Sequence, residues 1–315
     1  MPGEPLPSGE ENHVSITKST RVQAAIRMAR NRVRDLRVAA DIKRTTDVGP
    51  LPDFVIVGTM KAGTTSLAGN LRRHPEIFMP KGEVKFFNDH WHKGIAWYRE
   101  IFAEGAGKLS GEKTPDYMRL RRYMKRIHTV VPDAKIIVLL RDPVARLMSE
   151  INHKIYAKRL PATEQIDEQY IRKVILGDPM RKRRTFDRGY YLRQIQENIL
   201  SFYPRERVLI RATDERARAI DREDLGEGLL DGQLMGEDRS EFTRQLLDDI
   251  CDFLGVARYT GEETLKVSGV RVYKAPITRE AKELVHRLYA PENERLFEFL
   301  GYDISAWREE VAVGI

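Results

Sequence analysis

The sequence has little of several features that would narrow its class. It contains one cysteine, Cys251, in 315 residues, so no disulfide can form within the chain. No stretch approaches the ~18 consecutive apolar residues of a membrane-spanning helix, and residues 1–12 lack the apolar core of a secretory signal. The seven histidines are scattered and show no metal-ligand spacing. These absences predict a cytoplasmic globular protein that binds no metal, with Cys251 buried as a small apolar residue.

Positive charge is concentrated near the N-terminus. The net charge of the chain is +7, and the segment from His13 to Thr46 contains nine basic and two acidic residues. The remainder is close to balanced, which argues against a general nucleic-acid surface. Residues 1–12 are predicted to be disordered, and residues 13–46 are predicted to form a basic amphipathic extension.

An apolar period of three to four residues predicts a helix over residues 20–43. Its apolar positions are Val22, Ile26, Ala29, Val33, Leu36 and Ala39. Two interpretations remain open. In the first, the apolar stripe packs on the domain or on a second copy in a homodimer. In the second, the basic helix meets a membrane surface or an acidic partner.

Strands and helices alternate over residues 53–303. Apolar runs predict buried strands at 54–58, 135–140 and 207–211, and short extended segments at 77–79 and 85–87. Helical patterns occupy 64–73, 97–102, the stretch from 144, 164–203, 241–254 and 278–300. This order predicts a single α/β domain with a central parallel sheet. Residues 214–240 are polar and rich in glycine, and they are predicted to be an insertion.

The first predicted strand runs into a loop suited to phosphate. The residues Lys61-Ala62-Gly63-Thr64-Thr65-Ser66 follow shortly after Gly58. Backbone N–H groups at such a turn form an anion site with the positive end of the following helix, and Lys61 and three hydroxyls add to it. A Walker A loop ends in Gly-Lys-[Ser/Thr], whereas here the lysine stands two residues before the glycine. The loop therefore indicates a phosphorylated donor other than ATP or GTP; a glycine turn without a ligand is the alternative.

A second predicted strand ends in another candidate anion ligand. Arg141 follows residues 135–140, at the carboxyl edge where α/β sheets bind ligands, and Ser149 stands two helical turns further on. An arginine and a serine can together hold a second phosphate. The alternative is a structural pairing of Arg141 with Asp142 or Asp116.

Two further segments contain reactive residue types. Glu83 stands between Lys81 and Lys85, which favour an ionised carboxylate that can accept a proton from a hydroxyl. A solvated surface of lysine and glutamate is the alternative. The segment from Gly111 to Tyr117, which contains Lys113, looks on its own like an ordinary turn.

Together these four segments resemble a known family. They read Lys61-x-Gly-Thr-Thr-Ser66, Glu83-Val-Lys-Phe-Phe-Asn88, Glu112-Lys-Thr-Pro-x-Tyr117 and Leu140-Arg-Asp-Pro-x-x-Arg-x-x-Ser149. The arrangement is similar to that of the sulfotransferases that use 3′-phosphoadenosine 5′-phosphosulfate (PAPS). It is most similar to the branch that contains the heparan sulfate 3-O- and N-sulfotransferases and their bacterial relatives. The resemblance covers residues 53–211 and 246–301 and implies a P-loop-NTPase-like sulfotransferase fold.

The resemblance also implies roles for individual residues. The loop residues Lys61, Ala62, Gly63, Thr64, Thr65 and Ser66 match those that hold the 5′-phosphosulfate, and Arg141 and Ser149 match the pair that holds the 3′-phosphate. Glu83 matches the catalytic base, with Lys61 and Lys113 stabilising charge around the transferred group. Lys85 and Tyr191 match positions near the acceptor. The family has a Lys-Gly-Arg-type loop over the cofactor before the last helix; residues 268–274 depart from it but retain Arg271.

The expected reaction is transfer of a sulfuryl group from PAPS to a hydroxyl or amine of a small-molecule or glycan acceptor. The product would be adenosine 3′,5′-bisphosphate. No metal is expected to take part, because the transferred group is only singly charged. Two alternatives from other classes remain open, a P-loop small-molecule kinase and a non-catalytic nucleotide-binding protein on the same fold. The sequence does not identify the acceptor.

Overall fold

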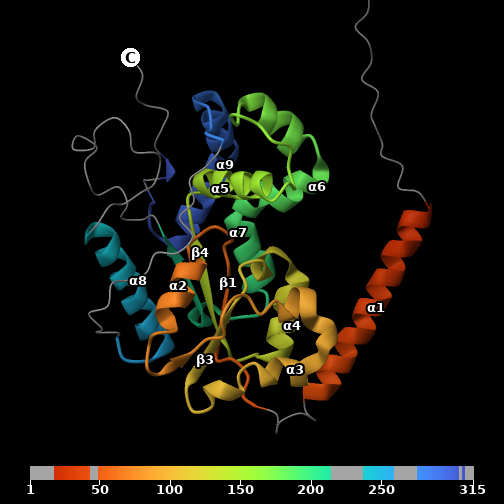
Figure 1. The fold of residues 1–315 in the computed structure, drawn as a ribbon, viewed down its shortest axis with the longest axis vertical. Coiled ribbons are helices and arrows are strands. Elements are labelled where there is room, and N and C mark those ends of the chain that lie inside the picture. The colour runs from red at the N-terminus through yellow and green to blue at the C-terminus, as the bar shows by residue number, and fades with distance from the viewer. Residues whose placement is uncertain (1–17, 43–48, 214–236, 259–274, 305–306, 309–315) are drawn as a thin grey trace, which may run out of the picture.

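The computed structural model describes residues 18–42, 49–213, 237–258, 275–304 and 307–308 (Figure 1). The predictions for residues 1–12, for most of the insertion and for Arg271 lie outside these residues. In the part of the chain that is described, no helix is both long and apolar enough to cross a membrane.

Five parallel strands form one sheet in the order β2-β3-β1-β4-β5. The two apolar runs at its centre are buried along nearly their whole length, as expected for strands of a parallel sheet that is covered on both faces. The predicted α/β class with a parallel sheet is therefore confirmed. The strands are β1 (Phe54–Gly58), β2 (Ile77–Phe78), β3 (Leu109–Lys113), β4 (Lys135–Leu140) and β5 (Val208–Ala212).

Helices cover both faces of the sheet and its carboxyl edge (Figure 1). The α-helices of the described residues are α1 (Lys18–Ile42), α2 (Thr64–Leu71), α3 (Gly94–Glu100), α4 (Arg121–Val130), α5 (Pro143–Tyr156), α6 (Pro179–Arg181), α7 (Tyr191–Gln194), α8 (Glu237–Leu254) and α9 (Arg279–Leu300). Shorter 3-10 and π-helical turns lie at Phe86–His90, Trp91–Lys93, Ala103–Gly105, Tyr117–Arg119, Tyr170–Leu176, Lys182–Phe186, Asp187–Gly189, Ile195–Ile199 and Arg205–Arg207.

Side chains of β1 point alternately to the two faces of the sheet and so contribute to two separate core clusters. Val55 and Val57 face a cluster formed with α3 and α4, whereas Phe54 and Ile56 face a cluster formed with α2 and α8. Cys251 of α8 is fully buried, as predicted. A third cluster joins α5 to α9, which lie beyond the upper ends of the strands in Figure 1. These helices pack beyond the carboxyl edge of the sheet, while Gly63 and Thr65, which follow β1, stay exposed.

The sequence analysis missed one strand. It treated residues 111–117 as a turn, but Leu109–Lys113 forms β3 and pairs with β1 and β2. The segment reads Leu-Ser-Gly-Glu-Lys and has no apolar run, so periodicity could not reveal it. Its polar side chains are nonetheless buried, because partners from other segments satisfy them.

Two predicted elements have a different form. Residues 85–87 are not extended, because Lys85 adopts a left-handed φ of 54° and the chain then winds into the turn Phe86–His90. The predicted helix over 164–203 is broken into short turns. Pro179 cannot donate a backbone hydrogen bond, and the Asp178 side chain caps a new start by accepting from Met180 N and Arg181 N.

The helix expected over residues 20–43 is present as α1 (Lys18–Ile42), but three of its apolar side chains do not pack on the domain. Ile26, Val33 and Leu36 are 47%, 52% and 66% exposed. Docking uses other positions near the end of the helix, where Val38 is buried and Asp35 pairs with Arg126 of α4 at 2.8 Å. The helix lies at the edge of the molecule (Figure 1), and its Ile26, Val33 and Leu36 side chains are exposed.

We expect Gly111→Ala to destabilise the fold. A Cβ at this position of β3 would lie 2.1 Å from the Phe54 ring in the core, and overpacking of this kind costs about 1–3 kcal/mol. The control is Gly69→Ala in α2, where a Cβ meets no heavy atom within 4 Å and helix propensity favours alanine by about 1 kcal/mol. Thermal unfolding of the two variants tests this; equal melting temperatures would show that the close contact at Gly111 carries no cost.

Candidate active site

The loop between β1 and α2 has the geometry of an anion site. Lys61 and Gly63 both adopt a left-handed φ of 74°, a conformation that costs a lysine on the order of 1 kcal/mol or more. Gly63 then caps α2, which begins at Thr64. The first N–H groups of a helix have no partner within the helix, and here they stand beside the hydroxyls of Thr65 and Ser66. The positive end of α2 is therefore presented at the carboxyl end of β1.

This loop lies at the topological switch point of the sheet. After β1 the chain runs to β2 on one side of the sheet, and after β4 it runs to β5 on the other side. The loops after β1 and β4 therefore diverge at the carboxyl edge. Arg141, which follows β4, donates from Nη1 to the carbonyl oxygen of Lys61 at 3.2 Å. The buried Tyr191 donates its hydroxyl to the carbonyl oxygen of Arg141 at 2.7 Å. Tyr191 thus fixes the backbone of the arginine that joins the two loops.

A second group of predicted residues meets beside α2. Lys113 Nζ lies 3.2 Å from Thr65 Oγ1 and 3.3 Å from Glu83 Oε1. Lys85 Nζ lies 3.4 Å from the other oxygen of Glu83. Lys113 is only 5% exposed, whereas Glu83 is 32% exposed. The structure therefore brings a partly accessible carboxylate, a buried ammonium and the start of α2 into one group of contacts.

For two predicted site residues, Ser149 and Thr64, the structure shows burial but no side-chain hydrogen bond with the other described site residues. Ser149 is buried on α5, two turns beyond Arg141. Thr64 is buried at the start of α2. Asp142 and Asp116, the alternative partners of Arg141, serve other groups: Asp142 caps α5 by accepting from Val144 N, and Asp116 binds two other arginines. The roles of Ser149 and Thr64 stay predictions.

A buried charge network that sequence reasoning did not identify reaches the loop between β1 and α2. Arg146 and Glu150 of α5 are both fully buried and pair at 2.5 Å, and Lys154 lies 2.6 Å from Glu150. Arg188 pairs with Asp116 at 2.8 Å, lies 3.8 Å from Glu150, and donates to the sulfur of Met60. The network therefore reaches the residue next to Lys61.

The balance of charge keeps Glu150 ionised. Burial raises the pKa of Glu150, but the nearby charges of Arg146, Arg188 and Lys154 lower it by more. The pKa of Glu150 therefore lies below its usual value. Burial likewise raises the pKa of Asp116, and the hydrogen bond from Arg119 with the charge of Arg188 brings it below the usual value. A sequence signal existed only for Glu150, which stands four residues after Arg146, the spacing of a helical ion pair.

These features define a class, the α/β proteins in which a glycine-containing loop joins the first strand to a helix at the switch point of a parallel sheet. The family model of the sulfotransferase domain matches residues 51–210. The chain therefore belongs to the sulfotransferase family, and the resemblance stated above is confirmed. Among the described residues, no group of three histidines, cysteines or carboxylates is placed to hold a metal ion.

Curated relatives match a central part of the chain. The membrane-associated sulfotransferase kil1 of Dictyostelium discoideum is 41% identical over 110 residues, which are 33% of this chain and 23% of that protein. Heparan sulfate glucosamine 3-O-sulfotransferase 3B1 of Mus musculus is 38% identical over 119 residues, 37% of this chain and 30% of that protein. The chain thus spans less than a third of the length of these relatives. A crystal structure of a sulfotransferase from Alicyclobacillus acidocaldarius covers 82% of this chain and all of that one, with a TM-score of 0.61 at 24% identity; it supports the fold.

We expect Glu150→Gln to be strongly destabilising. Removal of the carboxylate charge leaves Arg146 buried without its ion-pair partner, which costs about 3–5 kcal/mol. The control is Glu197→Gln, in a pair with Arg193 of the same i,i+4 spacing whose side chains are 58% and 73% exposed; its loss costs about 0.5 kcal/mol. Urea unfolding at neutral pH compares the two, and similar losses would contradict the argument.

The same pair predicts a pH dependence. Because the folded-state pKa of Glu150 is lowered, its contribution to stability is present above the pKa of the unfolded chain and is lost as pH falls through the folded-state value. The free energy of unfolding of Glu150→Gln should therefore fall less steeply in acid than that of the parent protein.

Proposed function

We propose that the protein transfers a sulfuryl group from PAPS to a hydroxyl or amine of an acceptor molecule. The observation that carries the proposal is the position of Lys113, which touches both Thr65 at the start of α2 and the carboxylate of Glu83. A group that binds anions and a group that accepts protons are thereby held at one point. A sulfuryl transferase needs both, because charge develops on the donor while the acceptor loses a proton.

The residues of the β1–α2 loop fit a phosphosulfate. The positive end of α2, the loop N–H groups and the Lys113 ammonium favour an anion there, and Thr65 and Ser66 offer hydroxyls. When bound, PAPS supplies a sulfuryl group whose bridging oxygen leaves with the 5′-phosphate. Arg141 and Ser149 would hold the 3′-phosphate, and Lys61 would face the transferred group. The second phosphate site is what favours PAPS over ATP and hence sulfuryl transfer over a P-loop kinase reaction.

Glu83 would act as the general base. In a single in-line displacement the acceptor oxygen or nitrogen forms a bond to sulfur while the bond from sulfur to the phosphate oxygen breaks, and the acceptor proton passes to Glu83. Lys113 and Lys85 stand on either side of this carboxylate. Lys113 would also stabilise the negative charge that develops on the leaving oxygen. Positioning and electrostatics supply most of the rate in such a reaction.

The acceptor that we propose is a carbohydrate hydroxyl or amine. Several relatives are named for heparan sulfate glucosamine, and one for both N-deacetylation and N-sulfation of heparan sulfate. Lys85 is 42% exposed beside Glu83 and is available to an acceptor that carries negative charge. The single buried cysteine supports a reducing compartment.

We expect Glu83→Gln and Arg141→Ala to separate chemistry from binding. Glu83→Gln should lower kcat about 10²–10⁴-fold, the usual contribution of a general base, and leave the affinity for adenosine 3′,5′-bisphosphate within about twofold. Arg141→Ala should weaken that affinity about tenfold or more through a lost charge-assisted contact. Transfer from labelled PAPS to a panel of glycans and phenols, with calorimetric titration of the product nucleotide, measures both.

Glu104→Gln, at an exposed site in the turn Ala103–Gly105, is the control and should leave both quantities unchanged. A parent protein that neither binds the product nucleotide nor turns over any acceptor would refute the proposal. Thermal stabilisation by ATP with Mg²⁺, but not by PAPS, would instead support the kinase alternative.

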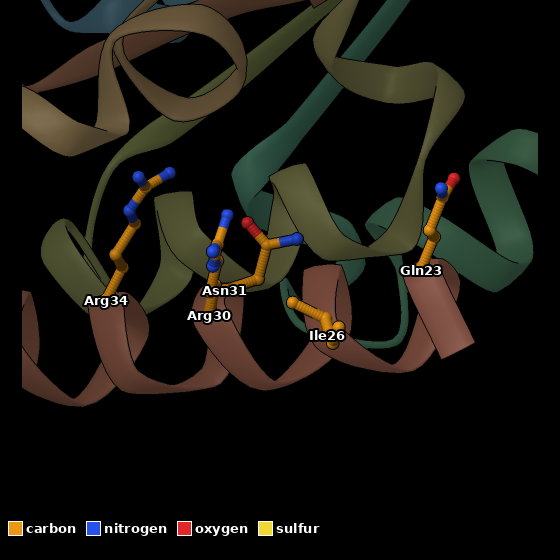
Figure 2. A pocket seen from close by; sticks show the side chains of 5 residues that line it. All are labelled: Gln23, Ile26, Arg30, Asn31 and Arg34. Atoms are coloured by element: carbon orange, nitrogen blue, oxygen red, sulfur yellow. The ribbon is translucent and has the colours of Figure 1, made fainter. Parts of the chain in front are cut away.

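We also propose that α1 contacts an anionic membrane surface. Its exposed apolar residues Ile26, Val33 and Leu36 lie on one side of the helix, and exposed Arg30 and Arg37 border them. Beside this stripe is a hollow lined by Gln23, Ile26, Arg30, Asn31 and Arg34 (Figure 2). An apolar stripe with basic borders is the pattern of a helix that lies in the headgroup region. The stripe also suits a second copy of the helix, but the arginines would then face arginines, which disfavours a homodimer.

Vesicle co-sedimentation of the full chain tests this contact. We expect binding to phosphatidylcholine vesicles that contain phosphatidylserine, weaker binding at high salt, and little binding to phosphatidylcholine alone. The triple variant Ile26→Ser, Val33→Ser, Leu36→Ser should lose binding, whereas Met180→Ser, which removes another exposed apolar side chain, should retain it. Absence of vesicle binding, with a dimer that the triple variant abolishes, would show that α1 pairs with a second copy instead.

A further inference from the structure

A second carboxylate lies beneath the candidate base and has no role in the proposal so far. Glu112 stands at the end of β3, next to Lys113, and is fully buried. Three hydroxyls donate to it: Tyr98 of α3 at 2.6 Å, Thr114 at 3.1 Å and Tyr117 at 3.2 and 3.3 Å. A buried carboxylate is costly unless its oxygens are satisfied, and here both oxygens accept hydrogen bonds.

Two of these hydroxyls also accept hydrogen bonds from the backbone around the base. Thr114 Oγ1 accepts from Lys85 N at 3.1 Å, and Tyr117 Oη accepts from Phe87 N at 3.3 Å. A hydroxyl has one proton to donate and lone pairs to accept. Because each proton points to Glu112, the lone pairs are turned towards the two amides. The Glu112 carboxylate therefore sets the direction of both contacts.

The two anchored amides belong to the segment that presents Glu83. Gly82 and Lys85 have left-handed φ values of 81° and 54°, so the chain turns sharply on both sides of Glu83. Lys85 is the strained residue of the two, because a non-glycine side chain disfavours this region. The hydrogen bond from its N–H to Thr114 helps to hold that conformation, and with it the direction in which Glu83 meets Lys113.

We propose that Glu112 is a positioning residue, which holds Lys85 and Phe87 through the hydroxyls of Thr114 and Tyr117 and so fixes Glu83 against Lys113. The inference rests on the proposed function, since it assigns Glu83 the part of general base. Glu112 itself touches no position that the donor or acceptor would occupy; it acts on the reaction through the segment that it anchors. A base held within a narrow range of orientations is what efficient proton transfer requires.

The titration of Glu112 supplies a readout that a purely structural role would not give. Burial raises the pKa of Glu112 to about 7, against the lowering effect of hydrogen bonds from Tyr98, Thr114 and Tyr117, and the charge of Glu83 raises it as well. A protonated Glu112 must donate where it now accepts, so one of the three hydroxyls no longer directs its proton to the carboxylate. The anchoring is therefore complete above neutral pH and weakens as pH falls through about 7.

The matched pair Thr114→Val and Thr114→Ser tests the relay. Valine keeps the shape of threonine and removes the hydroxyl, so kcat should fall about tenfold, the effect of one lost buried hydrogen bond, while the KM for PAPS stays within about twofold. Serine restores the hydroxyl and should recover most of the loss. Thr129→Val, which removes an exposed hydroxyl on α4, is the control and should leave kcat unchanged.

Hydrogen exchange of the same proteins gives a measurement that does not depend on the acceptor. The peptide that contains Lys85 and Phe87 should exchange about tenfold faster in Thr114→Val and in Glu112→Gln than in the parent protein, with Thr129→Val unchanged. Burial raises the pKa of Glu112 to about 7, so the kcat of the parent protein should decline as pH falls below that value. The side chain of Glu112→Gln is neutral at every pH, and this variant should lack that decline.

The outcomes separate the two proposals. If the parent protein binds no adenosine 3′,5′-bisphosphate and has no turnover, the proposed function fails, and faster exchange still supports the anchoring by Glu112. If the parent protein turns over while Thr114→Val keeps its kcat and its exchange rate, the positioning role is overturned. Thr114→Val remains decisive if Glu112→Gln fails to fold.

Discussion

One buried ammonium group holds the candidate active site together. Lys113 is 5% exposed, and its Nζ has Thr65 Oγ1 and Glu83 Oε1 as neighbours at 3.2 and 3.3 Å. A cation removed from water costs several kcal/mol unless it is paired and hydrogen-bonded, so the lysine requires both partners. The start of α2 and the loop of Glu83 must therefore meet at the end of β3. The contact of both segments with one lysine follows from this requirement.

The sheet supplies the point at which they meet. Lys113 lies in register with Ile56 of β1, and the next residue, Thr114, donates its N–H to the carbonyl oxygen of Ile56. The ends of β3 and β1 are thereby fixed side by side, two residues before β1 ends at Gly58. On the other side of β1, Arg141 reaches the carbonyl of Lys61. The loop between β1 and α2 is thus held from both neighbouring strands, although the residues that hold it come from distant parts of the sequence.

The sequence predicted what depends on apolar periodicity and on local motifs. β1, β4, α2, α5 and α9 were recognisable because apolar runs and cap residues mark them, and the motif around Lys61 indicated an anion site. β3 was missed because its burial depends on hydrogen bonds to Glu112 from residues elsewhere in the fold, which no local pattern encodes. The turn at Phe86–His90 was likewise hidden, since the anchoring of Lys85 by Thr114 spans 29 residues. The apolar stripe of α1 was visible in the sequence, but only the fold shows that its Ile26, Val33 and Leu36 are exposed.

Two carboxylates lie close to the end of β3, and their surroundings separate their functions. Glu83 is 32% exposed and lies between two ammonium groups, so its carboxylate is partly open to solvent. Glu112 is fully buried among hydroxyls, so no acceptor can reach it. Environment rather than residue type assigns the roles of paired carboxylates. The accessible one can exchange a proton with an acceptor, and the buried one can act only by orienting what surrounds it. Because Lys113 directly follows Glu112 on β3 and contacts Glu83 of another segment, β3 carries both the group that orients the site and the group that contacts the candidate base.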